Sequence, residues 1–515
     1  MLSTLRANQQ EMTQAVSDGY LAMLREKEAA KQDEYIRARE YYEGIHKTQL
    51  TERTRTFLNL KHDADFNANY CHMVVNAKAD RLSITGFKTD DSKEATDTDK
   101  AIMRWWKRNR MDRIQGIVHH AAIRDGDAFM LVEWDAVAKL PRFHYEPAFA
   151  GDGVMVYYSD ERRDEIAFAS KHWRISLGGN AGTMRRLNLY FPDRVEKYVS
   201  RDTETAGRWQ AFTEDENTEV GQGYLGQAGI VWWTDNGQAN GLPLGIPIVH
   251  FKNNDTGNEF GITHLAHVMP LQDALNKSLI DLIAAMDING FPLMVGFGDD
   301  WTVAKTGPGA IISTNASSSE ADFKVEKGLD PSGLIAAYNA LVMEIARVSG
   351  TPLSYLQSSG QVAAEGTMKQ QETALISQVQ KAQIDFGNAW EDVMAIACRL
   401  SMAFGDSADA IKLDEDMMIE AVWKDAQIRN EKEQAETLAI KVTQLGVSEE
   451  QAQVEMDYSP EQRESFAKAK LENEARAMKN AVTMQSEQAK LKQGMNQTDN
   501  EAGNKPPPQT GEKSA

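Results

Sequence analysis

One long helical pattern, at residues 367–404, most constrains how this chain can fold. Apolar residues recur there at steps of three and four from Leu375 to Leu400, and no proline interrupts them. A helix of that length would extend about 55 Å at 1.5 Å per residue, which is more than a small globular domain can cover. We therefore expect it to pack against copies of itself or to span a large particle.

Two further helical segments flank a short β-rich insert, which is an unusual order. The first covers residues 264–289 and is stopped by Pro292, and the second covers residues 332–348 directly after Pro331. Between them lie short β-like runs and the turn at residues 307–309. This order predicts an antiparallel two-helix stalk that carries a small tip.

The part of the chain before this stalk is predicted to be rich in antiparallel strands. Runs with a period of two are separated there by clusters of Gly, Asp, Asn and Pro. The runs are residues 129–134, 142–145, 154–158, 165–173, 186–191, 194–200, 208–212 and 230–233, followed by 246–251. Helices are expected before them, at residues 4–42 and 63–81 and as a pair over 101–124 that breaks near Asn109.

The charge balance excludes strong binding to nucleic acid through release of phosphate counterions. The 515 residues hold 76 Asp and Glu against 56 Lys and Arg, a formal net charge of -20. Residues 401–460 alone hold 14 acidic and 5 basic side chains, so they form an acidic segment. If DNA is a partner, we expect it to pass without being held.

The cysteine count and the lengths of the apolar runs predict in which compartment the protein folds. Cys71 and Cys398 are the two cysteines, too few for a disulfide framework, and this favours a reducing cytoplasm. We expect no signal peptide and no transmembrane helix, because Asp281 and Asp287 interrupt the most apolar helical segment.

The familiar catalytic signatures are missing, and this favours a binding or structural role. The sequence has no phosphate-binding GxxxxGK[ST] loop, no GxSxG elbow, no CxxC pair and no fitting dinucleotide loop. We therefore expect no enzymatic activity, no catalytic residue, no metal and no cofactor. Trp105 and Trp106 beside two basic residues could stack on nucleic acid, but core packing is the favoured interpretation, as it is for His119 and His120.

One alternative is a metal-dependent hydrolase. His264 and His267 are three residues apart at a predicted helix start, with His250 upstream, and two imidazoles at that spacing could bind one metal ion. No carboxylate stands where HExxH chemistry requires one. Surface or interface histidines are therefore the favoured interpretation, and the hydrolase is kept as an alternative.

Several strings, in a fixed order over about residues 41–400, resemble a known family. They are Tyr41-Tyr42-Glu43-Gly44, then Asn69, Val74-Val75, Arg81-Leu82 and Gly86-Phe87, then Ile246 to Asn253, and finally Ile345-Ala346, Ser349 to Pro352, Glu372, Phe386 and Trp390. This order is similar to that of the portal proteins of tailed bacteriophages, of the siphophage type.

The resemblance implies an α+β fold of the portal type and a division of the chain. The expected parts are a wing with N-terminal helices and β-rich part (1–260), a first stem helix (261–290), a small α/β clip (291–331), a second stem helix (332–348), a tunnel loop (349–366), a long helix with a return to the wing (367–424), a helical crown (425–491) and a disordered tail (492–515).

The resemblance also implies a function. Family members form a homo-oligomeric ring, typically of twelve subunits, at one vertex of the capsid, through which double-stranded DNA is packaged and ejected without sequence-specific binding. The implied partners are the terminase large subunit, a head–tail adaptor or connector protein, and the major capsid and scaffolding proteins, with no membrane. The protein is expected in the virion after assembly in the host cytoplasm. Another minor capsid or scaffold protein remains a further alternative.

The expected tunnel loop and the residues near it are the candidate site. An acidic bore would repel phosphates, so that DNA slides, while a few lysines touch the DNA backbone transiently. The loop residues are Ser349, Gly350, Thr351, Pro352, Gly360 and Gly366, and the candidate DNA contacts are Lys369 and Lys381.

Overall fold

The computed structural model divides the chain into two compact units, Met1–Ala426 and Gln427–Ala515. It describes residues 25–46, 68–89, 96–135, 137–159, 161, 165–176, 183–192, 195–200, 209–211, 230–231, 245–290, 294–297, 301–303, 312–314, 322–325, 330–357, 365–405, 418–427, 431–446, 448, 452, 466–480 and 484. Some of these, among them residues 287–290, the strands of 294–325 and residues 365–369, are described by their backbone alone.

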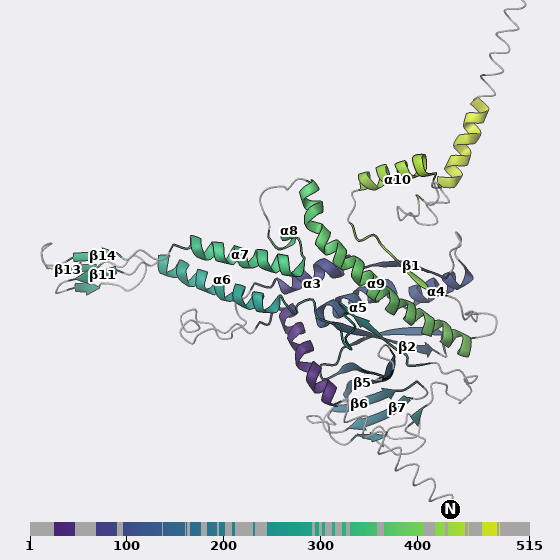
Figure 1. Ribbon diagram of the computed structural model, residues 1–515, viewed down its shortest axis with the longest axis horizontal. Coiled ribbons are helices and arrows are strands. Elements are labelled where there is room, and N and C mark those ends of the chain that lie inside the picture. The colour runs from purple at the N-terminus through teal and green to yellow at the C-terminus, as the bar shows by residue number, and fades with distance from the viewer. Residues whose placement is uncertain are drawn as a thin grey trace, which may run out of the picture. The chain divides into compact units, whose positions relative to one another are not determined.

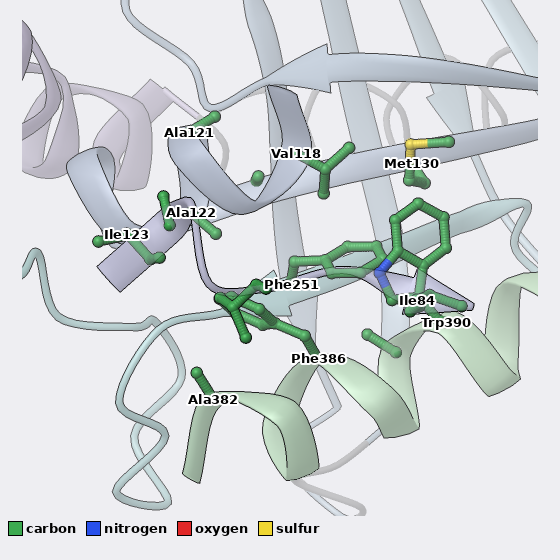
Figure 2. Close-up of a cluster of buried hydrophobic side chains, with 14 of the residues drawn as sticks. Ile84, Val118, Ala121, Ala122, Ile123, Met130, Phe251, Ala382, Phe386 and Trp390 are labelled. Atoms are coloured by element: carbon green, nitrogen blue, oxygen red, sulfur yellow. The ribbon is translucent and has the colours of Figure 1, made fainter. Parts of the chain in front are cut away.

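A three-stranded antiparallel sheet lies in the core of the first unit. Its order is β10-β2-β3, with β2 Asp127–Asp135, β3 Leu140–Pro147 and β10 Ile248–Lys252. The helices α5 (Met111–Asp125) and α9 (Glu365–Phe404) both contact β2, and Figure 2 shows Met130 of β2 among side chains of these helices. The run of apolar residues in β2 is explained by this burial on both faces.

A second antiparallel sheet carries the other predicted strands. Its strands are β4 Gly153–Tyr158, β5 Ile166–Ser176, β6 Thr183–Tyr190, β7 Val195–Ser200 and β8 Gln210–Ala211, in that order, and β9 Ile230–Val231 also pairs with β7. Successive residues of β2 alternate between two apolar clusters, with Met130 in one and Phe129 and Leu131 in the other. Every predicted β-run before the stalk contains a strand, and the strands are distributed over these two sheets.

The predicted order of helix, β insert and helix is confirmed. The helix α6 is Met269–Gly290 and α7 is Ser332–Ser349, and the two pack side by side (Figure 1). Between them β11 (Met294–Phe297) pairs with β14 (Asp322–Val325), and β12 (Trp301–Val303) pairs with β13 (Ile312–Thr314). The strand β12 was not predicted.

The helix α6 begins at Met269, five residues later than the pattern predicted. Pro270 explains the difference, because a proline has no N–H to donate and is tolerated in the first turn of a helix but not in its interior. Residues 263–268 form turns instead, in which the amide of Ala266 donates to the carbonyl of Thr263.

The remaining helices of the first unit were largely predicted. Helix α3 is Cys71–Ala79, and the predicted pair breaks between α4 (Asp97–Arg108) and α5, where Arg110 adopts a left-handed conformation at φ 56°. Residues 25–43 form a helix, as expected, while residues 4–24 and 63–67 of the predicted helices lie outside the described residues. The pairing of β1 (Ile84–Lys88) with β15 (Glu420–Trp423) was not predicted.

The second unit is helical where the structure describes it. Helix α10 is Glu431–Leu445, and residues 466–480 form another helix. The predicted tail, residues 492–515, lies outside the described residues. No helix in the described part of the chain combines the length and apolarity that crossing a bilayer requires.

Candidate functional site

The expected tunnel loop begins at the C-terminal end of α7. Ser349 is the last helical residue, and Gly350 follows it in the left-handed conformation, with φ 67°. A Cβ atom at Gly350 would lie 2.5 Å from Nε2 of Gln378 on α9. Glycine is therefore favoured here by the left-handed backbone conformation, whereas the Gln378 side chain could move aside for a Cβ.

The first half of the expected loop is folded against its surroundings. The hydroxyl of Ser349 donates to Oγ1 of Thr351 at 2.9 Å, and both Thr351 and Pro352 are buried. A short helix, α8 (Leu353–Leu356), follows and buries Leu356. Nε2 of Gln357 then donates to Oδ1 of Asn339 on α7 at 3.1 Å.

The second boundary of the loop also differs from the prediction. Helix α9 begins at Glu365, so Gly366 lies in its first turn rather than in the loop. Gly360 lies outside the described residues, so its role in the loop stays a prediction.

Arg81 connects this loop to the rest of the first unit. It follows the C-terminal end of α3, and its Nη2 donates to the hydroxyl of Tyr355 on α8 at 2.8 Å and to Oε1 of Glu372 on α9 at 3.0 Å. Its Nη1 donates to the carbonyl of Ala426 at 3.3 Å. The side chain of Arg81 is only 6% exposed. The resemblance included Arg81 and Glu372 as separate strings, and gave no indication that they meet.

The two candidate lysines are both placed on α9. The backbone of Lys369 is helical, and its side chain lies outside the described residues. Lys381 is exposed, as a phosphate contact would require, and it lies one turn before Asp385. Burial raises the pKa of Asp385, and the positive charge of Lys381 partly opposes that rise. Contact of either lysine with DNA stays a prediction.

A third lysine near α9 is buried and was not predicted. Nζ of Lys78 donates to Oδ1 of Asn253 at 2.8 Å, and its side chain is almost completely enclosed. Burial lowers the pKa of Lys78 to about 8, although Asp385 acts in the opposite direction. Lys78 therefore cannot reach a ligand from the surface.

The histidines of the hydrolase alternative have separate environments. Nε2 of His250 lies 2.7 Å from Oδ1 of Asp127, and Nδ1 lies 2.8 Å from the hydroxyl of Tyr158. Burial lowers the pKa of His264 to about 3, whereas His267 is exposed. Among the residues described, no three His, Cys, Asp or Glu side chains are grouped to hold a metal ion.

The aromatic pair and its neighbours belong to the core, as predicted. Trp105 and Trp106 are buried, and the ring of Trp106 meets that of Trp390 edge-on at 5.3 Å between centroids. His119 is buried beside them, and its Nε2 accepts a hydrogen bond of 2.9 Å from Nε1 of Trp390. Stacking of these tryptophans on nucleic acid is therefore not supported.

With this architecture in place, comparison with known proteins identifies the class. The model of the family described as "Phage portal protein, SPP1 Gp6-like" matches residues 22–500. The chain belongs to this family of phage portal proteins. It is 22% identical to the portal protein of Mycobacterium phage L5 and 23% identical to that of Mycobacterium phage D29, each over 425 residues that cover 78% of both chains.

Solved structures were also matched. A chain of the structure titled "Neck of empty GTA particle computed with C6 symmetry" has 11% sequence identity and a TM-score of 0.39, with 80% of this chain and 95% of that chain covered. A chain of the virion of a native gene transfer agent particle has 10% identity and the same TM-score of 0.39, with 76% and 90% covered. The assignment rests on the family and its sequence relatives.

The family match confirms the resemblance, and the helices and antiparallel sheets of the first unit confirm the α+β class. Phage portal proteins are components of the virion at the capsid vertex and assemble as homo-oligomeric rings. The hydrolase alternative is not favoured. The boundaries of wing, stem, clip and crown, and the residues of the tunnel loop, stay predictions.

Proposed function

We propose that this chain forms a ring of twelve subunits whose central channel conducts double-stranded DNA into the procapsid and later out of the virion. The terminase large subunit and a head–tail connector protein dock on the clip, residues 291–331. The ring assembles in the host cytoplasm with the major capsid and scaffolding proteins. The observation that carries the proposal is the match to the portal family over residues 22–500.

The exposed apolar side chains of the long helices support packing between subunits. Met286 on α6 is 59% exposed, Met343 on α7 is 51% exposed and Ile384 on α9 is 66% exposed. A neighbouring copy would remove these side chains from water, which is favourable. A head-to-tail contact that closes on itself generates a ring.

The charge of the chain supports passage of DNA without tight binding. A net charge of -20 favours a channel lining that is acidic overall, which would repel phosphates and let a duplex pass. Lys369 and Lys381 would touch the DNA backbone only transiently. The ring itself performs no catalysis, and the work of packaging comes from ATP hydrolysis by the terminase.

Replacement of the clip by a short linker between α6 and α7 tests this function. The linker variant is expected to form rings, because the clip is a separate insert between the two helices, but to lose binding of terminase and connector in pull-down and packaging assays. A chain ended after residue 491 is the control and should retain both. Unchanged partner binding by the linker variant would contradict the proposed docking and favour a scaffold or other minor capsid role.

A further inference from the structure

Arg81 has contacts that the proposed channel does not explain. It lies just beyond α3, yet its guanidinium contacts α8 through Tyr355, α9 through Glu372 and the chain at Ala426. These three partners are 274, 291 and 345 positions away in the sequence. One side chain thus joins three segments that are remote in the chain.

The chemistry of arginine suits this position. Its planar guanidinium carries several N–H donors in a fixed arrangement and stays protonated, so it can serve several acceptors at once. The carboxylate of Glu372 compensates the buried positive charge. A lysine at this position would keep the charge, but its compact ammonium could not reach the same three acceptors in the same geometry.

The contact with Tyr355 differs from the other contacts of α8. Gln357 ties the end of this short helix to Asn339 of α7, the helix that precedes it in the chain. The Tyr355 hydroxyl instead ties it to Arg81, next to α3, and the guanidinium carbon lies 5.9 Å from the centre of the Tyr355 ring. Tyr355 is 38% exposed, so loss of its hydroxyl opens no cavity in the core.

We infer that Arg81 is the positioning residue of the tunnel loop. It fixes α8, which lies in the described first half of the expected loop, and the second turn of α9 against the end of α3. Without the Tyr355 hydroxyl, α8 keeps the buried contact of Leu356 and the bond from Gln357, but it loses its hydrogen bond to Arg81 beside α3. The expected effect on DNA packaging rests on the proposed channel function. The anchor, by which we mean the contacts of Arg81 with Tyr355 and Glu372, does not depend on that function.

Hydrogen exchange in the full-length chain tests the anchor. The amide of Tyr355 donates to the carbonyl of Pro352 at 3.0 Å, and that of Gln357 donates to the carbonyl of Leu353 at 2.8 Å, so both report on α8. In Tyr355→Phe we expect these two amides to exchange about fivefold faster, the effect of one ordinary hydrogen bond. Arg81→Lys is expected to act in the same direction and to extend the effect to the first turns of α9.

Tyr42→Phe is the matched control. Its hydroxyl donates to Oδ1 of Asn76 on α3 at 3.1 Å and to no residue of α8, so the exchange of the Tyr355 and Gln357 amides should not change. Unchanged exchange of the Tyr355 and Gln357 amides in Tyr355→Phe would overturn the inference that Arg81 holds α8 in place. Equal loss of protection throughout α3 and α9 in Arg81→Lys would also overturn it, because Arg81 would then be a general core residue.

DNA packaging provides the functional readout. Rings of Tyr355→Phe should form as well as wild-type rings and package DNA several-fold more slowly. Faster exchange with normal packaging would overturn the role of Arg81 in positioning the loop for DNA passage. Failure of the wild-type chain to form rings would instead contradict the proposed function and leave the anchor standing.

Discussion

Acidification should weaken the core of the first unit through His119. This side chain is completely buried, stacks on Phe386 at 5.5 Å between ring centroids, and accepts a hydrogen bond from Nε1 of Trp390 (Figure 2 shows the surrounding cluster). Only a neutral imidazole has a nitrogen that can accept. Protonation would place two N–H donors opposite each other and leave a charge in an apolar core.

The size of this loss of stability follows from the difference between the pKa of His119 in the folded chain and its pKa in the unfolded chain. Burial lowers the pKa of His119 from 6.5 to about 3 in the folded protein. Between these values the unfolded chain binds a proton that the folded chain does not, so stability falls as the pH falls. At pH 5, binding of this proton stabilises the unfolded state by about 2 kcal/mol relative to the folded state. This corresponds to an equilibrium constant for opening of the core that is about 30-fold larger than without the proton.

Native-state hydrogen exchange of the α9 amides near Trp390 measures this effect without requiring the whole chain to unfold in one step. His119→Gln is the comparison, because its amide oxygen can accept from Trp390 and does not titrate. Between pH 7 and pH 5, wild-type protein should lose about 2 kcal/mol more opening free energy than this variant. His267→Gln, at an exposed histidine, should behave as wild type. An equal loss in wild type and His119→Gln would refute the reasoning.

Two further changes test the packing of the first unit. Gly261→Ala should lower stability by about 3 kcal/mol or more in thermal unfolding, because its Cβ would overlap the carbonyl oxygen of Gly126. Gly116→Ala is the control: a Cβ at this position on α5 has open space, so the variant should be neutral or stabilising. The pKa of Lys78 is lowered from 10.5 to about 8, so the folded chain releases its proton before the unfolded chain does, and the Lys78 contribution to the stability of wild type should rise by about 2.5 kcal/mol between pH 8 and pH 10.5. Burial raises the pKa of Cys71 and Cys398 to about 12, which opposes this rise equally in wild type and in Lys78→Met, so the two proteins are compared with each other. Lys78→Met should lack this rise in urea unfolding, and a rise equal to that of wild type would contradict the assignment.

Local periodicity predicted most elements of this fold. The long helix, the stem helices and the short strands each have apolar residues at a regular spacing, and that pattern depends only on which face is buried. The packing role of Trp106 was predicted for another reason, because adjacent residues on a helix point apart and cannot both stack on one ligand. The start of α6 was predicted wrongly because Pro270, which limits where a helix can begin, was not weighed.

Contacts between remote segments could not be predicted from these patterns. The strand β15 has four residues, too few for a clear alternation, and it forms by pairing with β1 more than 300 positions earlier. The same applies to Arg81, Tyr355 and Glu372, since nothing local marks a polar side chain as the partner of another far away in the chain. The first half of the expected tunnel loop is held by such contacts, and the residues of the loop stay a prediction.

Electron-microscopy class averages of the purified full-length chain, alone and together with its capsid assembly partners, test the central claim most directly. We predict closed rings with rotational symmetry, whose opening admits a DNA duplex and is lined with a net negative charge. A chain that stays monomeric or dimeric even with those partners, or an opening lined mainly by lysine and arginine, would contradict the account.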